Sequence, residues 1–487
     1  MADFKFVGAA YTAPSIYQSD QECINYYPEV DPMKNPGMPQ MGMPQQRGMI
    51  ALYPTPGLVT EIQLPNVGPI RAMHTLPGST AILTVCGSSV YLINSGFNAT
   101  YIGELLSNSG YCGISDNVLS AMIVDVNSRY SVDLATNTLT MIPYSDGAFV
   151  GGSCVDVVDN FLAYARPNSQ QWAATDALST TTQALSFASK FGSSDNLVGL
   201  IVNHRQVYLL GEFTSEVWVD VGAFPFPFEI IPGSSMQHGC AAVRSISRLG
   251  NSFALLSKDT RGQAIVCVMN GYSMERISTH AIENSMVGVS ISDASAFTYQ
   301  LEGHEFYVLT VPSINLTWVF DAATGLWHKW LYWDAAKGFT RHRGNCCAVM
   351  NSQIIIGDYE NGKIYSLSQT AETDAGTPVR RVRRAPHLTT DFQRQYFSEL
   401  QIQFEPGVGL STGQGSNPQA MLRWSDDGGS TWSSEHWVTL GAQGQFKNRA
   451  IWRRLGSARD RIFEVTVSDP VNCSIISANL KATAAAN

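Results

Sequence analysis

Two basic stretches near the C-terminal end carry the side chains best suited to binding an anion. The first is the run Arg380-Arg381-Val382-Arg383-Arg384, and the second covers residues 452–461. Planar guanidinium groups bind phosphate through paired hydrogen bonds, so either stretch could bind a nucleic-acid backbone. Because the whole chain has a net charge of −9, we favour ion pairing of these arginines across a subunit interface. On that interpretation, replacing Arg380 and Arg381 with Ala leaves DNA affinity unchanged.

A second motif with defined chemistry is Ser425-Asp426-Asp427-Gly428-Gly429-Ser430-Thr431-Trp432. It resembles the Asp-box of sialidase-type propellers, whose fixed places are occupied here by Ser425, Asp427, Gly429 and Trp432. The box is a tight hairpin in which the aspartate accepts hydrogen bonds from loop amides and the tryptophan packs beneath. We therefore expect a structural turn. A glycan-binding or sialidase-like propeller is the alternative function, and a fluorogenic sialoside assay would detect it.

Other motifs of catalysis or cofactor binding are absent from the sequence. It has no G-x-x-x-x-G-K-[ST] phosphate loop, no H-E-x-x-H zinc motif and no G-x-S-x-G nucleophile motif. Its nine cysteines are scattered without C-x-x-C spacing, which indicates buried thiols rather than disulfides or a zinc site. The sequence therefore predicts no enzyme, no cofactor and no metal site.

The composition favours a subunit of an assembly. Charged residues make up 15% of the chain, whereas soluble domains average about 25%. So few charges indicate either much buried surface or much surface for partners. The N-terminus lacks a signal peptide and no run of 18 apolar residues occurs, so we expect folding in a cytoplasm. The acidic net charge argues against a general nucleic-acid binder but suits a channel through which DNA slides.

The elements that must position these residues are short β-strands in a repeating order. Runs of β-branched and aromatic residues alternate with turn residues. They predict hairpins over residues 81–93, 121–134, 161–172, 200–219, 252–268, 305–320 and 353–367. A spacing of about 40–50 residues is typical of propeller blades, which stack because one sheet cannot bury both of its faces. We predict an all-β chain with a β-propeller-like domain of six or seven blades; a pair of β-sandwiches is the alternative.

One turn in the sixth hairpin is similar to the strand-turn-Trp unit of kelch-like blades. Its strand ends at Phe320, Asp321 opens the turn, and Gly325 relaxes it before Trp327 begins the next strand. We expect Asp321 to satisfy turn amides and Trp327 to fill space between blades.

Three parts of the chain are predicted from these patterns. Residues 1–58 form an extended arm, whose Met- and Pro-rich loop offers soft apolar contacts for an interface at Met38, Met41 and Met43. Residues 59–372 form the propeller-like domain. Residues 373–487 form a C-terminal β-rich domain that is sandwich-like, and residues 397–404 within it alternate between the two faces of a strand.

Several segments resemble the tail hub, or packaged-DNA stabilisation, proteins of short-tailed bacteriophages. The resemblance runs over almost the full length, through Asn25-Tyr26-Tyr27-Pro28-Glu29-Val30, Leu52-Tyr53-Pro54-Thr55-Pro56-Gly57-Leu58, Gly211-Glu212-Phe213-Thr214-Ser215-Glu216-Val217-Trp218, Met236-Gln237-His238-Gly239-Cys240, the 422–432 segment and Trp452-Arg453-Arg454-Leu455-Gly456. The loop at 32–49 looks like an insertion.

This resemblance implies a virion structural protein, assembled in the cytoplasm of a bacterial host. Such hubs form a homo-oligomer, a hexameric ring below the portal and the head-to-tail adaptor. They extend the channel through which double-stranded DNA passes without sequence readout, help retain packaged DNA until ejection, and dock a tail needle, spikes or fibres. The family has no catalytic residues. An adaptor for a tail fibre, without a DNA channel, is a further alternative.

Overall fold

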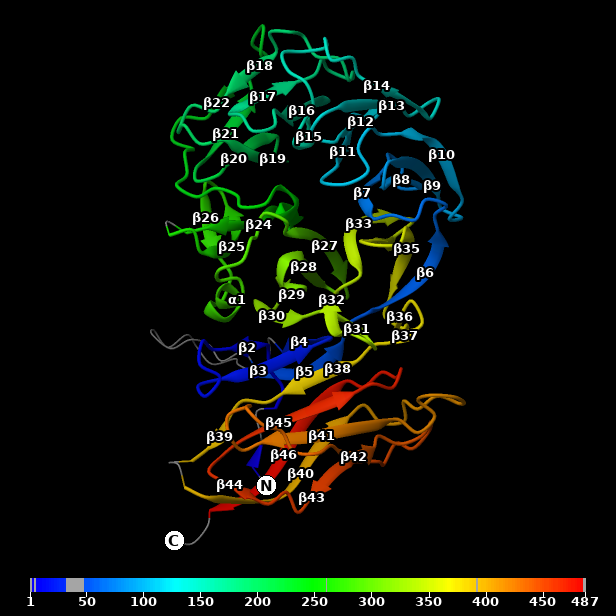
Figure 1. The fold of residues 1–487 in the computed structure, drawn as a ribbon, viewed down its shortest axis with the longest axis vertical. Helices are drawn as coiled ribbons and strands as arrows, with labels where there is room; N and C mark the ends of the chain where they lie inside the picture. The colour runs from blue at the N-terminus through cyan, green and yellow to red at the C-terminus, as the bar shows by residue number, and fades with distance from the viewer. Residues whose placement is uncertain (1, 4–5, 32–47, 260, 391–392, 485–487) are drawn as a thin grey trace.

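The computed structural model describes residues 2–3, 6–31, 48–259, 261–390 and 393–484 (Figure 1). The predicted contacts Met38, Met41 and Met43 lie outside these ranges. The described chain is almost entirely β, with one short helix, α1 (His280–Ser285), and two 3-10 turns, η2 (Val243–Ser245) and η3 (Pro312–Ile314). No helix in the described ranges is long and apolar enough to cross a membrane.

A ring of seven antiparallel sheets forms a β-propeller, which confirms the predicted all-β fold (Figure 1). The first three blades are β7 (Ile70–Thr75), β8 (Ala81–Cys86), β9 (Ser89–Asn94) and β10 (Ala99–Glu104); β11 (Gly113–Asp116), β12 (Ser120–Val124), β13 (Arg129–Asp133) and β14 (Thr138–Met141); and β15 (Val155–Val158), β16 (Phe161–Ala165), β17 (Gln171–Ala174) and β18 (Phe187–Ser189). The next three are β19 (Leu197–Asn203), β20 (Gln206–Gly211), β21 (Ser215–Asp220) and β22 (Phe228–Ile230); β23 (Ser247–Leu249), β24 (Ser252–Lys258), β25 (Ala264–Asn270) and β26 (Ser273–Arg276); and β27 (Ser295–Leu301), β28 (His304–Val311), β29 (Leu316–Asp321) and β30 (Leu326–Lys329).

The predicted hairpins supply the middle strands of these blades. Each blade is an antiparallel meander, and successive blades bury apolar side chains between them. Between the first two blades, for example, Leu83 and Val85 pack with Ile123 and Val132. The apolar layer between the fifth and sixth blades continues into the core of the C-terminal domain. Stacking therefore buries both faces of sheets that could not fold alone, and the alternative of two β-sandwiches is wrong.

The seventh blade is closed by a strand from the other end of the propeller sequence. Its inner strands are β33 (Gly344–Met350), β34 (Gln353–Asp358) and β35 (Lys363–Ser368), and β6 (Gly57–Gln63) pairs antiparallel with β35. Two short strands, β36 (Thr373–Asp374) and β37 (Thr377–Pro378), extend this sheet, and the hairpin of β31 (Leu331–Asp334) and β32 (Gly338–Arg341) precedes it. Closure with β6 joins the start of the propeller sequence to its last blade.

Gly57, the first residue of β6, is expected to be intolerant of a side chain. A Cβ atom there would lie 2.3 Å from the Ala371 carbonyl oxygen and 2.6 Å from that of Thr373. Because backbone carbonyls cannot swing aside, we expect Gly57→Ala to lower the free energy of unfolding by about 1–3 kcal/mol in urea titrations. Gly68→Ala is the control, since its Cβ would meet Gly87 at an ordinary 3.5 Å. Equal losses in the two variants would contradict this explanation.

The C-terminal domain is a sandwich of two sheets that also takes in the N-terminal strands. One sheet has the order β4 (Tyr26–Asp31), β5 (Gly48–Pro54), β46 (Ile475–Ala484), β40 (Gln395–Phe404) and β43 (Ala450–Arg453), with β1 (Ala2–Asp3) and β44 (Ser457–Ala458) beside it. The other has the order β3 (Asp20–Ile24), β38 (Arg381–Arg384), β45 (Asp460–Val467), β41 (Gln419–Ser425) and β42 (His436–Thr439), with β2 (Tyr11–Thr12) and β39 (Leu388–Thr389).

The described part of residues 1–58, predicted as an extended arm, contains the strands β1 to β5 and the start of β6. Strands β1, β3 and β5 pair with strands more than 300 residues later, β1 and β5 with β46 and β3 with β38, while β2 pairs with β3 and β4 pairs with β5. Short strands without strong alternation become ordered here because the sandwich offers them partners and a core. The division of the chain at residues 58 and 372 stays a prediction.

Candidate functional site at the junction of propeller and sandwich

Asn25, between β3 and β4, connects the two domains through a buried side chain. Its Nδ2 donates to the carbonyl oxygens of Leu331 at 2.9 Å and Arg380 at 2.7 Å, and its Oδ1 accepts from the Leu331 amide at 2.8 Å. The backbone is in the left-handed region, with φ of 58°, which asparagine tolerates better than most residues. The side-chain amide group of Asn25 thus bonds the backbone of Leu331, on the β31–β32 hairpin, and of Arg380, directly before β38.

A buried histidine makes a second connection across the junction. His304 on β28 lies between two carboxylates, with Nδ1 2.8 Å from Asp321 Oδ2 and Nε2 2.9 Å from Glu29 Oε2. Asp321 also accepts from the Ala323 amide at 3.0 Å and the Thr324 hydroxyl at 2.8 Å. The predicted turn residue Asp321 is therefore also the partner of a charged group that reaches the N-terminal strand β4.

Protonation of His304 should make stability depend on pH. The hydrogen bond to Asp321, supported by Glu29, raises the pKa of His304 to about 9. Since an unfolded histidine has a pKa of about 6.5, the stabilisation is complete below that pH and is lost as the pH rises through 9. We expect a loss of about 2 kcal/mol between pH 6.5 and 9.5.

Thermal unfolding across that pH range would measure this effect. The His304→Gln variant should show a flatter profile at alkaline pH, because it has no imidazolium to deprotonate. Exposed His238 supplies the control, and His238→Gln should keep the wild-type profile. An unchanged slope in His304→Gln would show that other groups cause the dependence.

The predicted arginine run lies on β38, the strand between β3 and β45. Arg381 and Arg383 are fully buried. Arg381 pairs with Glu372, and Arg383 donates to the carbonyl oxygens of Phe6 at 2.6 Å and of Ala9 and Glu22 at 3.1 Å. Burial lowers the pKa of Arg383 to about 10, so it is charged at neutral pH. Neither side chain is available to phosphate or to another subunit, because partners within the chain occupy both.

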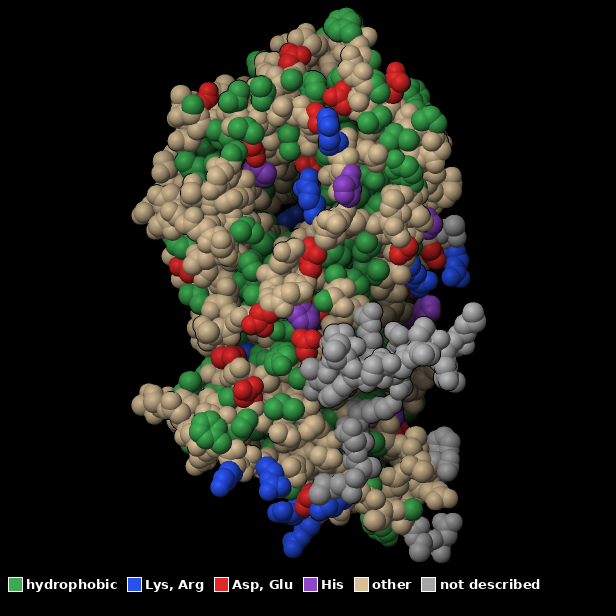
Figure 2. All heavy atoms as spheres, turned by 180° about the vertical axis from the view of Figure 1, so that it is seen from behind, with side chains coloured by type: hydrophobic (Ala, Val, Ile, Leu, Met, Phe, Trp, Pro, Cys, Tyr) green, Lys and Arg blue, Asp and Glu red, His purple; other side chains and the backbone are tan. Residues whose placement is uncertain are grey.

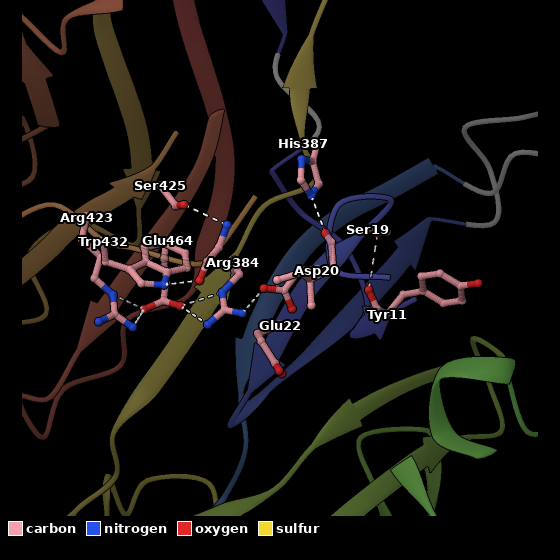
Figure 3. A network of polar contacts seen from close by, with 12 residues as sticks. Tyr11, Ser19, Asp20, Glu22, Arg384, His387, Arg423, Ser425, Trp432 and Glu464 are labelled. Carbon is pink, nitrogen blue, oxygen red and sulfur yellow. Dashed lines mark hydrogen bonds and ion pairs between the residues drawn. The ribbon is translucent and has the colours of Figure 1, made fainter. Parts of the chain in front are cut away.

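Arg384 belongs to an ion network that spans the four strands β3, β38, β45 and β41 (Figure 3). Its Nε donates to Glu464 Oε2 at 2.8 Å, and it pairs with Asp20 on β3. Arg423 donates to the other oxygen of Glu464 at 2.6 Å. Trp432 lies under both guanidinium groups, 4.8 Å from Arg384 and 4.7 Å from Arg423. The remaining member of the run, Arg380, is half-buried and lies over the Trp333 ring at 4.3 Å.

The Asp-box segment forms the turn after β41, in the sandwich and outside the seven blades. Asp427 accepts hydrogen bonds from the Ser425 hydroxyl at 2.7 Å and the Thr431 amide at 2.8 Å, and the Gly429 amide donates to Ser425 Oγ at 2.8 Å. The Trp432 indole donates to the Gly429 carbonyl at 3.1 Å. Because the box is not part of a blade, it does not support a sialidase-like propeller.

The other predicted structural residue, Trp327, lies between blades. Its ring is buried against Phe320, with centroids 5.1 Å apart, and its indole donates to the Ile277 carbonyl at 2.9 Å.

Two segments quoted for the tail-hub resemblance, 211–218 and 236–240, lie together in the structure. The Cys240 amide donates to the Gly211 carbonyl at 2.8 Å, and the Ser215 hydroxyl donates to the His238 carbonyl at 2.7 Å.

Three residues of the junction were not predicted from the sequence: Asn25, His304 and Glu464. Asn25 had a signal in its place within the Asn-Tyr-Tyr-Pro-Glu segment, whereas His304 and Glu464 had none, since their partners are distant in sequence. In the part of the chain that the structure describes, no group of three or more His, Cys, Asp or Glu side chains could hold a metal ion.

Comparison with protein families gives two matches. A family model described as "Bacteriophage P22 Gp10, beta-propeller" matches residues 47–372, and one described as "Bacteriophage P22 Gp10, beta-sandwich" matches residues 380–483. The comparison with curated proteins gives no match.

Two solved structures are similar to part of the chain. The N-terminal domain of Nup159 is 11% identical, with 67% of this chain and 97% of that chain covered at a TM-score of 0.42. The Cps50 (Swd1) β-propeller domain from Myceliophteria thermophila is 8% identical, with 64% and 99% covered at a TM-score of 0.42.

Proposed function

Because the chain belongs to the bacteriophage P22 Gp10 family of phage stabilisation proteins, we propose that it acts as the tail hub of a phage virion. Copies form a ring, with six as the expected number, below the portal and the head-to-tail adaptor. The ring extends the DNA channel, helps retain the packaged double-stranded DNA, and docks a needle, spikes or fibres. The protein does this by assembly and without catalysis.

The junction carries this proposal. A hub must hold its two domains in one orientation while neighbours and DNA press on it, and buried Asn25, His304 and Arg383 supply fixed links between N-terminal strands, propeller and sandwich. Ion pairs and hydrogen bonds of this kind are directional, so they select one geometry.

The charge distribution supports contacts between unlike surfaces of neighbouring copies. Residues 380–487 contain 13 Lys and Arg against 9 Asp and Glu, which leaves 18 against 31 in residues 1–379. Exposed basic residues of the sandwich include Arg453, Arg454 and Arg459, and Figure 2 shows Lys and Arg gathered at the end of the sandwich far from the propeller. A ring closes through such heterologous contacts, here basic sandwich against acidic propeller.

Negative-stain imaging of the purified full chain, alone and with the head-side adaptor, tests the proposal. We expect closed rings with the adaptor present, and fewer rings when Arg454 and Arg459 are both changed to Glu. A chain that stays monomeric in both conditions would overturn the ring. Hydrolysis of a sialoside by the pure protein would instead favour the enzymatic alternative.

A further inference from the structure

A polar cavity of about 190 Å³ lies on the propeller axis. Its lining comes from the inner strands and their neighbouring loops, and includes Arg71, Tyr111, Arg244, Ser295, Asn345 and Cys346. Figure 2 shows a hollow at the centre of the propeller with Lys or Arg side chains inside it. No Asp or Glu is among the lining residues, which is unusual in a chain with nine more acidic than basic residues.

The two arginines in this cavity differ in their partners. Arg71 is buried and donates to three uncharged carbonyl oxygens, of Gly87 at 3.0 Å, Ser107 at 2.9 Å and Gly110 at 3.2 Å. Among the described residues, Arg244 has neither a hydrogen bond nor an ion pair. Both guanidinium groups therefore keep an uncompensated positive charge.

Burial makes the positive charge of Arg244 energetically unfavourable. It lowers the pKa of Arg244, and the neighbouring cations Arg341 and Arg71 lower it further. An isolated charge in a poorly solvated site is unfavourable unless a counter-ion is present. The hydroxyl groups of Tyr111 and Ser295 line the same space and can donate hydrogen bonds.

We propose that this axial cavity binds one small oxyanion of the phosphate or sulfate type, held by the Arg244 guanidinium and the Tyr111 and Ser295 hydroxyls. The volume suits such an ion, since it is several times the roughly 30 Å³ that a water molecule occupies. The ion would connect the loop before the second blade, the loop before the fifth blade and the first strand of the sixth blade, through Tyr111, Arg244 and Ser295. This inference is independent of the proposed function.

Titration calorimetry of the full chain with inorganic phosphate, against chloride at equal ionic strength, tests the site. We expect one saturable site per chain and a rise in the unfolding temperature with phosphate. Arg244→Met should bind phosphate roughly 10- to 100-fold more weakly, because it loses charge-assisted hydrogen bonds. Arg244→Lys, which keeps the charge but not the planar fork, should bind with intermediate affinity.

Stability without phosphate separates an anion site from a structural role. Without phosphate, Arg244→Met should unfold at a higher temperature than the wild type, because it removes a half-buried charge that has no ion-pair partner among the described residues. Arg248→Met is the matched control: Arg248 lies four residues later, is exposed and pairs with Asp156 at 2.8 Å, so phosphate binding should not change. Absence of saturable binding, an equal phosphate response in Arg244→Met, or a lower unfolding temperature of that variant without phosphate would each overturn the proposal.

Discussion

Asn25→Ala is expected to lower the free energy of unfolding by about 3–5 kcal/mol, one of the two largest effects of a single substitution that the structure predicts. The change removes three buried hydrogen bonds at once, two to the carbonyl oxygens of Leu331 and Arg380 and one from the Leu331 amide. Each backbone group left unpaired costs about 1–3 kcal/mol when water cannot reach it. Urea unfolding followed by tryptophan fluorescence would measure the loss.

Asn315 provides the control for backbone strain at Asn25. It has nearly the same left-handed conformation, with φ of 53° against 58°, but it lies exposed in a turn. Asn315→Ala therefore carries the conformational cost together with the loss of only one exposed hydrogen bond, from the Arg341 amide at 3.0 Å, and we expect it to lose about 1 kcal/mol. If both variants lost the same free energy of unfolding, the hydrogen bonds of the Asn25 amide between the domains would not contribute to stability.

Arg383→Met is expected to cost about 3–5 kcal/mol, because it removes a fully buried guanidinium group and its hydrogen bonds to three backbone carbonyl oxygens. The guanidinium group is the only described side chain that bonds the carbonyl oxygens of Phe6, Ala9 and Glu22 together. Without it, the segment before β3 loses its attachment to β38. Limited proteolysis should then cleave within residues 6–22 faster than in the wild type, and urea unfolding should report the lost stability.

Arg380 is a matched control three positions earlier in the same basic run. Among the residues that the structure describes, its Nε has no hydrogen-bond partner, and its guanidinium group lies over the Trp333 ring. Arg380→Met should therefore change stability by less than about 1 kcal/mol. A comparable loss in both variants would mean that the run acts through its total charge and not through the individual bonds of Arg383.

These variants test whether a small number of buried polar groups fixes the orientation of the propeller relative to the sandwich. The apolar layer of the fifth and sixth blades runs into the sandwich core, so hydrophobic burial alone would hold the domains together. Burial is not directional, however, whereas the bonds of Asn25, His304 and Arg383 are. We infer that the apolar core supplies the adhesion and the polar junction supplies the orientation.

The propeller could be predicted because its signals are local. Each blade hairpin consists of β-branched or aromatic runs separated by turn residues, such as Asn361-Gly362 between β34 and β35, and these preferences act within a few residues. The turn at Asp321 and the box at Ser425 are local for the same reason. The period of the hairpins then indicated stacking around an axis.

The partners of the charged groups could not be predicted, because they depend on contacts across hundreds of residues. Four arginines in five positions look like an exposed patch, but β38 lies between β3 and β45 and buries two of them. Likewise, nothing in residues 57–63 indicates that this strand closes the seventh blade beside β35. The sequence by itself determined the repeating hairpins, since strand and turn preferences are short-range. Only the tertiary structure decided which strand closes the ring, where the N-terminal strands pair and which charges are buried, since these follow from pairing between distant segments that leaves no local pattern.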